Sequence, residues 1–194
     1  MNKILNRKTL LNVLFAGLFL VLILVPPAKA MVLEGLMKIG FFTPDLQEQN
    51  VKDRAKDFSG VLFKDTAGNV VNLGKLKGKV VFLNFWATWC PPCLAEMPAI
   101  QQLYEQFKND PEVVFILVDA DGDLVKSAKF MSRKKYEMPV YRVESEVPET
   151  LFKGSLPTTI VFDRQGRISY NESGAANYAN TKFIAFINKL KTMN

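Results

Sequence analysis

A nearly continuous apolar run leads into a pair of cysteines, and an amphipathic pattern follows them. The run covers residues 79–86 (KVVFLNFW). Such a run, without polar alternation, is typical of a strand that is covered on both faces of a sheet. From Pro91 to Lys108, apolar residues recur at every third or fourth position, which predicts a helix with a kink at Pro98. Cys90 and Cys93 therefore stand at a strand-to-helix junction.

The pattern of the remaining chain predicts an α/β fold with a mixed central sheet flanked by helices. Strands are expected at 113–118, 158–162 and 167–170, a short strand or connector at 139–143, helices at 123–135 and 179–191, and an N-terminal β-hairpin extension from 61–63 and 70–73. We assign residues 58–194 to one domain. Residues 31–57 mix Gly, Pro and charges, and we expect a spacer with little regular structure there.

The first thirty residues have the composition of a secretory signal. Three cations lie within residues 1–8, residues 10–25 are apolar apart from one Asn, and Ala28-Lys29-Ala30 provides a cleavage site. An uncleaved membrane tether through residues 10–25 is the alternative, because this run is close to the about 20 residues of a spanning helix. Both interpretations predict a periplasmic or extracytoplasmic protein. The second interpretation also anchors the protein to the inner membrane.

The residue inventory excludes several classes of site. The chain has two cysteines and no histidine. These are too few for a disulfide framework, a four-ligand zinc site, a Ser-His-Asp triad or a Cys-His pair. Beyond residue 30, 21 basic residues face 19 acidic ones, and the two signs are interspersed. Nucleic acid is therefore not an expected partner.

Three aspartates resemble a calcium-binding loop only superficially. They are Asp119, Asp121 and Asp123, but Leu124 and Phe130 stand where such a loop needs Gly and Glu. A solvated strand-to-helix turn, capped by an Asp, is the better interpretation. No metal site is predicted.

Two cysteines with this spacing can act as a nucleophile and a resolving thiol. A helix N-terminus lowers the pKa of the first thiol. Pro91 and Pro92 have no N–H, so the remaining donors to the Cys90 sulfur are the N–H groups of Cys93 and Leu94. We expect a Cys90 pKa that is only moderately lowered and a reducing or intermediate potential. The alternative is an inert pair of core cysteines or a passive disulfide.

These motifs together resemble the thioredoxin superfamily, and in particular its exported TlpA/ResA-like thiol–disulfide oxidoreductases. The resemblance covers roughly residues 58–191, and its motifs are GKVV at 78–81, NFWATWCPPC at 84–93, EMP at 96–98, LPTT at 156–159 and FDRQG at 162–166. It implies a thioredoxin-like three-layer fold. It also implies an enzyme whose redox-active disulfide, Cys90–Cys93, serves in place of any other cofactor.

The resemblance also implies roles for individual residues. Cys90 is the expected nucleophile and Cys93 the resolving thiol. Pro157 is the expected cis-proline, which exposes the backbone of Leu156 to an extended substrate. Pro98 is the expected kink of the active-site helix.

One departure from the family concerns proton transfer. Thioredoxins proper carry a buried Asp where this chain has Asn84, so Glu96 becomes the candidate base for the resolving thiol. The alternative for Glu96 is a solvated acid near a helix start. Trp89 is expected to shield the dithiol and present a flat platform to substrate, or alternatively to belong to the core. Leu156 and Thr158 flank Pro157 and are expected either to touch substrate or to pack at the strand start.

The leading functional hypothesis is an exported disulfide reductase. It would receive electrons from a membrane thiol donor and pass them to protein substrates with thiols or disulfides, for example during cytochrome c maturation. The alternatives are a disulfide oxidase or isomerase, a thiol peroxidase, and a non-catalytic copper-binding module.

Overall fold

The computed structural model describes residues 7–38, 40–46 and 57–193 of the 194-residue chain. Expectations about residues 1–6 and 47–56 lie outside the described residues.

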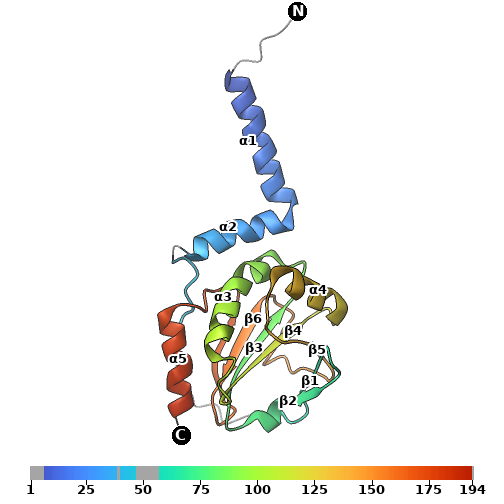
Figure 1. Cartoon of the computed structure of the whole chain (residues 1–194), viewed down its shortest axis with the longest axis vertical. Coiled ribbons are helices and arrows are strands. Elements are labelled where there is room, and N and C mark those ends of the chain that lie inside the picture. The colour runs from blue at the N-terminus through green and yellow to red at the C-terminus, as the bar shows by residue number, and fades with distance from the viewer. Residues whose placement is uncertain (1–6, 39, 47–56, 194) are drawn as a thin grey trace, which may run out of the picture.

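A mixed sheet forms the centre of the domain (Figure 1). Its strands are β1 (Leu62–Asp65), β2 (Val70–Asn72), β3 (Val80–Trp86), β4 (Val113–Asp119), β5 (Val140–Val143), β6 (Thr158–Phe162) and β7 (Ile168–Ser173). Within the described residues their order is β2-β1-β5-β4-β3-β6-β7. β4 runs parallel to β3 and β5, while β6 runs antiparallel to β3. The predicted mixed sheet is confirmed.

The predicted N-terminal hairpin is confirmed as β1 and β2, and it extends one edge of the sheet through the antiparallel pairing of β1 with β5. Its turn is stabilised by Asp65, whose carboxylate accepts hydrogen bonds from the N–H groups of Ala67 and Asn69 at 2.9 and 2.8 Å. Gly68 adopts φ +89° in this turn, a conformation that side chains disfavour.

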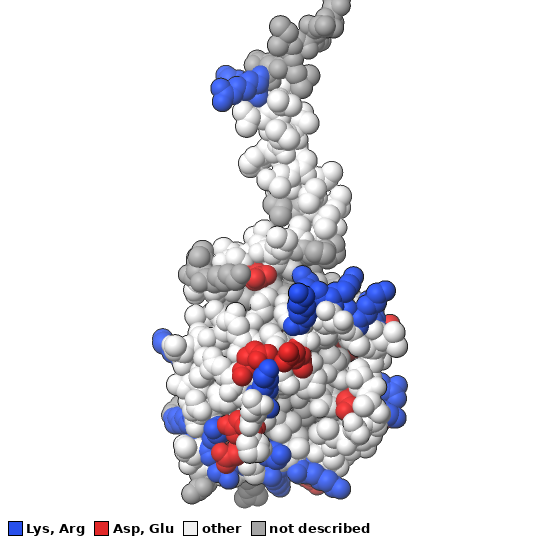
Figure 2. All heavy atoms as spheres, viewed as in Figure 1, with Lys and Arg blue, Asp and Glu red and all other residues white. Residues whose placement is uncertain are grey.

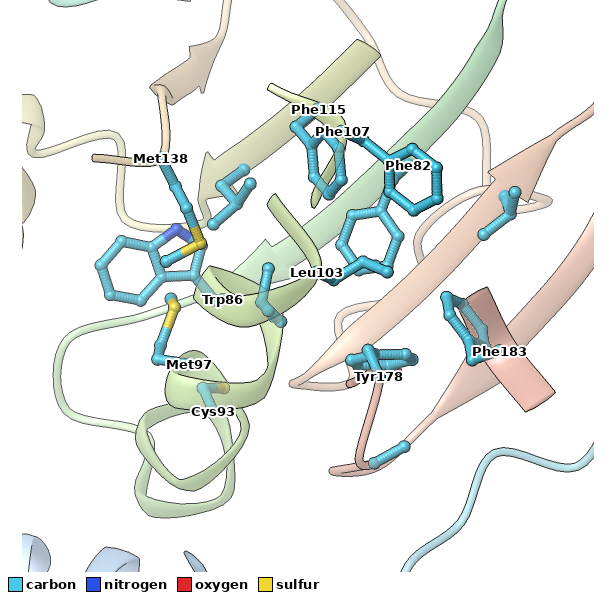
Figure 3. Packing of buried hydrophobic residues seen from close by; sticks show 14 of the residues in the cluster. Phe82, Trp86, Cys93, Met97, Leu103, Phe107, Phe115, Met138, Tyr178 and Phe183 are labelled. Carbon is cyan, nitrogen blue, oxygen red and sulfur yellow. The ribbon is translucent and has the colours of Figure 1, made fainter. Parts of the chain in front are cut away.

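The central strand β3 is buried along its whole length, as its apolar run predicts. Val80, Phe82 and Trp86 pack into a core that includes side chains of α3 (Pro91–Phe107), α4 (Leu124–Lys134) and α5 (Thr181–Thr192). Figure 3 shows Cys93 and Met97 of α3 in this core. Alternate residues of β3 point to opposite faces, so both faces contribute to the core.

The opposite face of the sheet has a different cover. Val81, Leu83 and Phe85 pack with residues from the hairpin, from the short 3-10 helix η1 (Leu73–Leu76) and from the loop that contains Leu151. Phe85 stacks on Phe152 of the same loop, with ring centroids 4.4 Å apart. This layer therefore contains little α-helix, because a long loop and η1 supply its apolar side chains.

The N-terminal part of the chain is more helical than its composition predicts. After α1 (Arg7–Leu24), a second helix, α2 (Pro26–Lys38), crosses the end of the domain above α3 (Figure 1). The expectation of little regular structure in 31–57 is therefore wrong for residues 31–38. Proline is compatible with a first helical position, so Pro26 starts a new helix after α1 has ended.

α2 is held by packing against the domain. Ala30 and Met37 are buried together with Ala95 of α3. The carbonyl of Met37 accepts a hydrogen bond from the side chain of Asn177 at 3.3 Å, and the carbonyl of Phe42 accepts one from the Asn177 backbone at 2.9 Å. Among the described helices, none has both the length and the apolar character needed to cross a membrane.

Candidate active site

The two cysteines occupy the turn between β3 and α3. Cys90 is the N-cap of α3, and the N–H of Cys93 donates to its sulfur at 3.3 Å. The N–H of Leu94 donates instead to the carbonyl oxygen of Cys90 at 3.0 Å, so the expectation that Leu94 could serve the sulfur is wrong. Pro91 and Pro92 fill the first two helical positions, where a missing N–H does not interrupt the helix.

Cys90 and Cys93 form a disulfide bond. Both residues are buried, with 3% of Cys90 and none of Cys93 exposed. The structure therefore shows the oxidised form of the dithiol, set into the end of the core.

The cis-proline lies at the same end of the sheet as the dithiol. The peptide bond between Leu156 and Pro157 is cis, as the resemblance implies. Thr158, the next residue, pairs with Phe85 near the end of β3, so Pro157 stands at the edge from which the chain enters the cysteine turn. Leu156 is half-buried.

The hydroxyl group of Thr158 is hydrogen-bonded to neighbouring residues at the start of β6. Its hydroxyl group bonds to the carbonyl of Ser155 at 2.8 Å and lies 2.9 Å from the hydroxyl of Ser173. These contacts favour a packing role for this side chain over contact with substrate.

Glu96 lies on the core side of α3, one helical turn after Cys93. Its side chain is fully buried, so the interpretation as a solvated helix acid is wrong. Its carboxylate accepts hydrogen bonds from the side-chain amide of Asn84 at 2.8 Å and from the N–H of Ala176 at 3.4 Å. Burial raises the pKa of Glu96 from its usual 4.5 to about 8, although the two hydrogen bonds oppose this shift.

Asn84 links this acid to the strand that follows the cis-proline. Its side-chain nitrogen donates both to Glu96 and to the hydroxyl of Thr159, each at 2.8 Å. Thr159 had no role assigned from the sequence. Its position directly opposite Asn84 in the antiparallel register is the signal that could have found it, but this register depends on the pairing of distant segments.

Trp89 precedes the dithiol and is exposed to solvent over 56% of its surface. The interpretation as a core residue is therefore wrong. Its indole N–H donates to the carboxylate of Asp121 at 2.7 Å, which anchors the ring to the loop before α4. From the sequence, Asp121 is expected only as part of a solvated turn, and its contact with Trp89 is not predicted.

The Asp-rich turn is only partly as expected. Asp123 caps α4 by accepting a hydrogen bond from the N–H of Lys126 at 3.0 Å, which confirms the predicted cap. Asp119, in contrast, is buried and bonded to the hydroxyl of Ser127, and its burial raises the pKa of the carboxyl. The expectation of a solvated turn is therefore wrong for Asp119.

Known proteins resemble this chain in sequence and in fold. Residues 50–182 match the model of the Redoxin family. The thiol–disulfide oxidoreductase ResA of Bacillus cereus is 35% identical over 130 residues, which cover 66% of this chain and 72% of the relative. The ResA protein of Bacillus subtilis is 33% identical over 113 residues, or 58% of this chain and 63% of the relative.

Solved structures of related proteins have the same fold as this chain. A thiol:disulfide interchange protein of the thioredoxin family from Chlorobium tepidum superimposes with a TM-score of 0.54 at 25% identity, covering 72% of this chain and 99% of the other. The exposed lipoprotein thioredoxin of Streptococcus pneumoniae has the same fold, with a TM-score of 0.52 at 24% identity over 68% of this chain and 98% of the other. The chain thus belongs to the Redoxin family and is a thioredoxin-like thiol–disulfide oxidoreductase of the TlpA/ResA type.

Proposed function

We propose that the protein reduces disulfide bonds of extracytoplasmic proteins through Cys90 and Cys93, for example during cytochrome c maturation. The observation that carries this direction is the environment of the Cys90 sulfur. Among the helix-start N–H groups, only that of Cys93 donates to it, because the preceding positions are prolines. A thiolate with few donors is poorly stabilised, and a poorly stabilised thiolate favours the oxidised protein and hence a reducing couple.

The reaction proceeds by two thiol–disulfide exchanges. The thiolate of Cys90 attacks one sulfur of the substrate disulfide, and the other substrate sulfur leaves and takes up a proton. Cys93 then transfers its proton to the ionised carboxylate of Glu96, and the resulting thiolate attacks the Cys90 sulfur. The second substrate sulfur leaves as a thiolate and takes up a proton from solvent. The substrate gains two electrons, and the protein ends in the disulfide form that the structure shows.

The reduced dithiol must be regenerated by an electron donor, for which we propose a membrane protein with a dithiol. Its thiols would reduce the Cys90–Cys93 disulfide by the reverse exchange and become oxidised themselves. Beyond this disulfide the proposed reaction needs no further cofactor.

We propose that the N-terminal segment stays attached and tethers the protein to the extracytoplasmic side of the membrane. The expected cleavage site Ala28-Lys29-Ala30 lies within α2, and Ala30 is buried against α3. The apolar side chains of α1 are largely exposed, so this helix has apolar surface to offer to lipid. Mass measurement of the protein from membrane and soluble cell fractions tests this, because cleavage after Ala30 and release into the soluble fraction would contradict it.

A redox titration against glutathione tests the proposed direction. We expect a potential well below the about −120 mV of a strong oxidant. A value near that potential would identify an oxidase instead. A Cys93→Ser variant should accumulate mixed disulfides between Cys90 and substrate proteins, and a Cys90→Ser variant, which lacks the nucleophile, is the matched control.

A further inference from the structure

Thr159 occupies a position from which it can control the amide of Asn84. The two residues face each other across β3 and β6, and neither is exposed to solvent. The Thr159 hydroxyl oxygen accepts one hydrogen bond from Asn84, while a second bond from the same nitrogen reaches Glu96. The two N–H groups of one amide are thus shared between a fixed strand residue and the buried acid.

The other end of the amide provides no comparable restraint. The side-chain oxygen of Asn84 is buried and has no hydrogen-bond partner among the described residues. An amide that is held only through its nitrogen depends on both of its acceptors for its orientation. Without the Thr159 hydroxyl, Asn84 would keep an unsatisfied buried N–H and would lose the contact that sets the plane of the amide.

We propose that Thr159 is a positioning residue, which holds the Asn84 amide so that it donates to Glu96 and thereby couples the cis-proline strand to the buried acid. This inference rests on the proposed role of Glu96 as the proton acceptor of Cys93. Thr159 lies two residues after Pro157, so a substrate that pairs with the backbone at Leu156 would bind at the start of the same strand.

The surroundings of Glu96 leave few other groups that could dominate its titration. The phenols of Tyr170 and Tyr178 face it from β7 and from the segment before α5, and burial raises the pKa of both. They stay neutral at pH values where Glu96 titrates. Cys93 precedes Glu96 on α3, and α2, which packs on α3, carries Lys29 and Glu34.

The test is a titration of the Glu96 carboxyl by carbon-13 NMR in the reduced full-length protein. In a Thr159→Val variant we expect the pKa of Glu96 to rise by about 0.5 to 1 unit, because a donor to its charged form is weakened. Thr159→Ser keeps the hydroxyl and should titrate like the wild type. Thr158→Val is the matched control, because the hydroxyl group of Thr158 bonds to Ser155 and Ser173 and not to Asn84.

Two results would overturn the proposal: an unchanged titration in Thr159→Val, or an equal shift in Thr158→Val. A measurement on the wild type covers the case in which Thr159→Val does not fold. Both side-chain amide protons of Asn84 should exchange slowly with deuterated water, and fast exchange of either one contradicts the proposed restraint.

A different variant, Glu96→Gln, tests the proposed role of Glu96 in the reaction. If Glu96→Gln leaves the pH profile of disulfide exchange unchanged, Glu96 is not the proton acceptor, whatever the Thr159 variants show. If Glu96→Gln changes the profile while Thr159→Val titrates as the wild type does, only the positioning role fails.

Discussion

Folding transfers the carboxyl group of Glu96 from water into the core, where its charged form is disfavoured. The pKa is about 8 in the folded chain against an ordinary 4.5, so between these values the folded chain retains a proton that the unfolded chain has released. The free energy of unfolding therefore falls as the pH rises through this window. The contribution of Glu96 to stability is largest at the acid end of this window and is lost as the pH rises toward 8.

A Glu96→Gln variant should abolish this pH dependence. In urea unfolding of the oxidised protein at pH 5, 6.5 and 8, we expect the wild type to lose up to about 1.4 kcal/mol per pH unit relative to the variant. Glu149→Gln, at an exposed site, should behave as the wild type does. Parallel curves for Glu96→Gln and the wild type would show that Glu96 keeps an ordinary pKa.

Trp89 combines a fixed orientation with an exposed ring, which suits contact with a protein substrate. We expect Trp89→Ala to slow the reduction of a protein disulfide about tenfold, the loss that corresponds to one moderate interface contact. The free energy of unfolding should change by less than about 0.5 kcal/mol because the ring is exposed. Exchange with dithiothreitol should be unaffected, and an equal loss with both reagents would assign Trp89 to the dithiol chemistry itself.

At the scale of elements, the start of α3 sets the properties of the Cys90 sulfur. An N-cap side chain accepts a hydrogen bond from the N–H group of the second or third helical residue. The third residue, Cys93, donates, whereas the second is Pro92 and has no N–H. One of the two N–H groups that could donate to the Cys90 sulfur is therefore absent.

Pro92→Ala restores the missing donor and should lower the pKa of the Cys90 thiol by about 0.5 to 1 unit. The reduction potential should rise by up to about 30 mV, since the reduced form is stabilised. Thiolate absorbance against pH and a glutathione titration measure the two effects. Pro91→Ala is the matched control, because the first helical N–H does not face the cap. Equal shifts in both variants would contradict this account.

At the scale of the whole molecule, α2 joins the N-terminal segment to the active-site helix.

Charged side chains are gathered at the same end of the domain. Figure 2 shows Lys and Arg side chains over α4, close to α2. The cations Lys126, Lys129, Arg133 and Lys134 are exposed on α4. The charges are thus less evenly spread in space than they are along the chain.

Ala95→Arg should displace α2, because Ala95 is 1% exposed and is buried with Ala30 and Met37. Hydrogen exchange measured by mass spectrometry should then show loss of protection over residues 26–38, with β3 still protected. Val125→Arg, at a residue that is 81% exposed, should leave both regions as in the wild type. Unchanged protection of residues 26–38 in Ala95→Arg would show that α2 does not depend on this contact.

Local patterns along the chain were sufficient to predict most helices and strands and the position of the dithiol. The apolar run predicted β3 to within one residue, and the three- and four-residue spacing predicted α3 to within one residue at its end. The same reasoning failed for α2, because Gly and Pro lower helix propensity while packing of Ala30 and Met37 on α3 supplies the stability. Propensity is local, whereas such a contact joins residues far apart in the chain.

Neighbours along the chain are enough to predict the reactive pair, the helix that starts at it and the prolines that withhold donors. The burial of Glu96, the bridge from Asn84 to Thr159 and the exposure of Trp89 appear only in the folded chain. A pKa and a hydrogen-bond partner depend on which segments the fold brings together, and β3, α3 and β6 meet only in the folded domain.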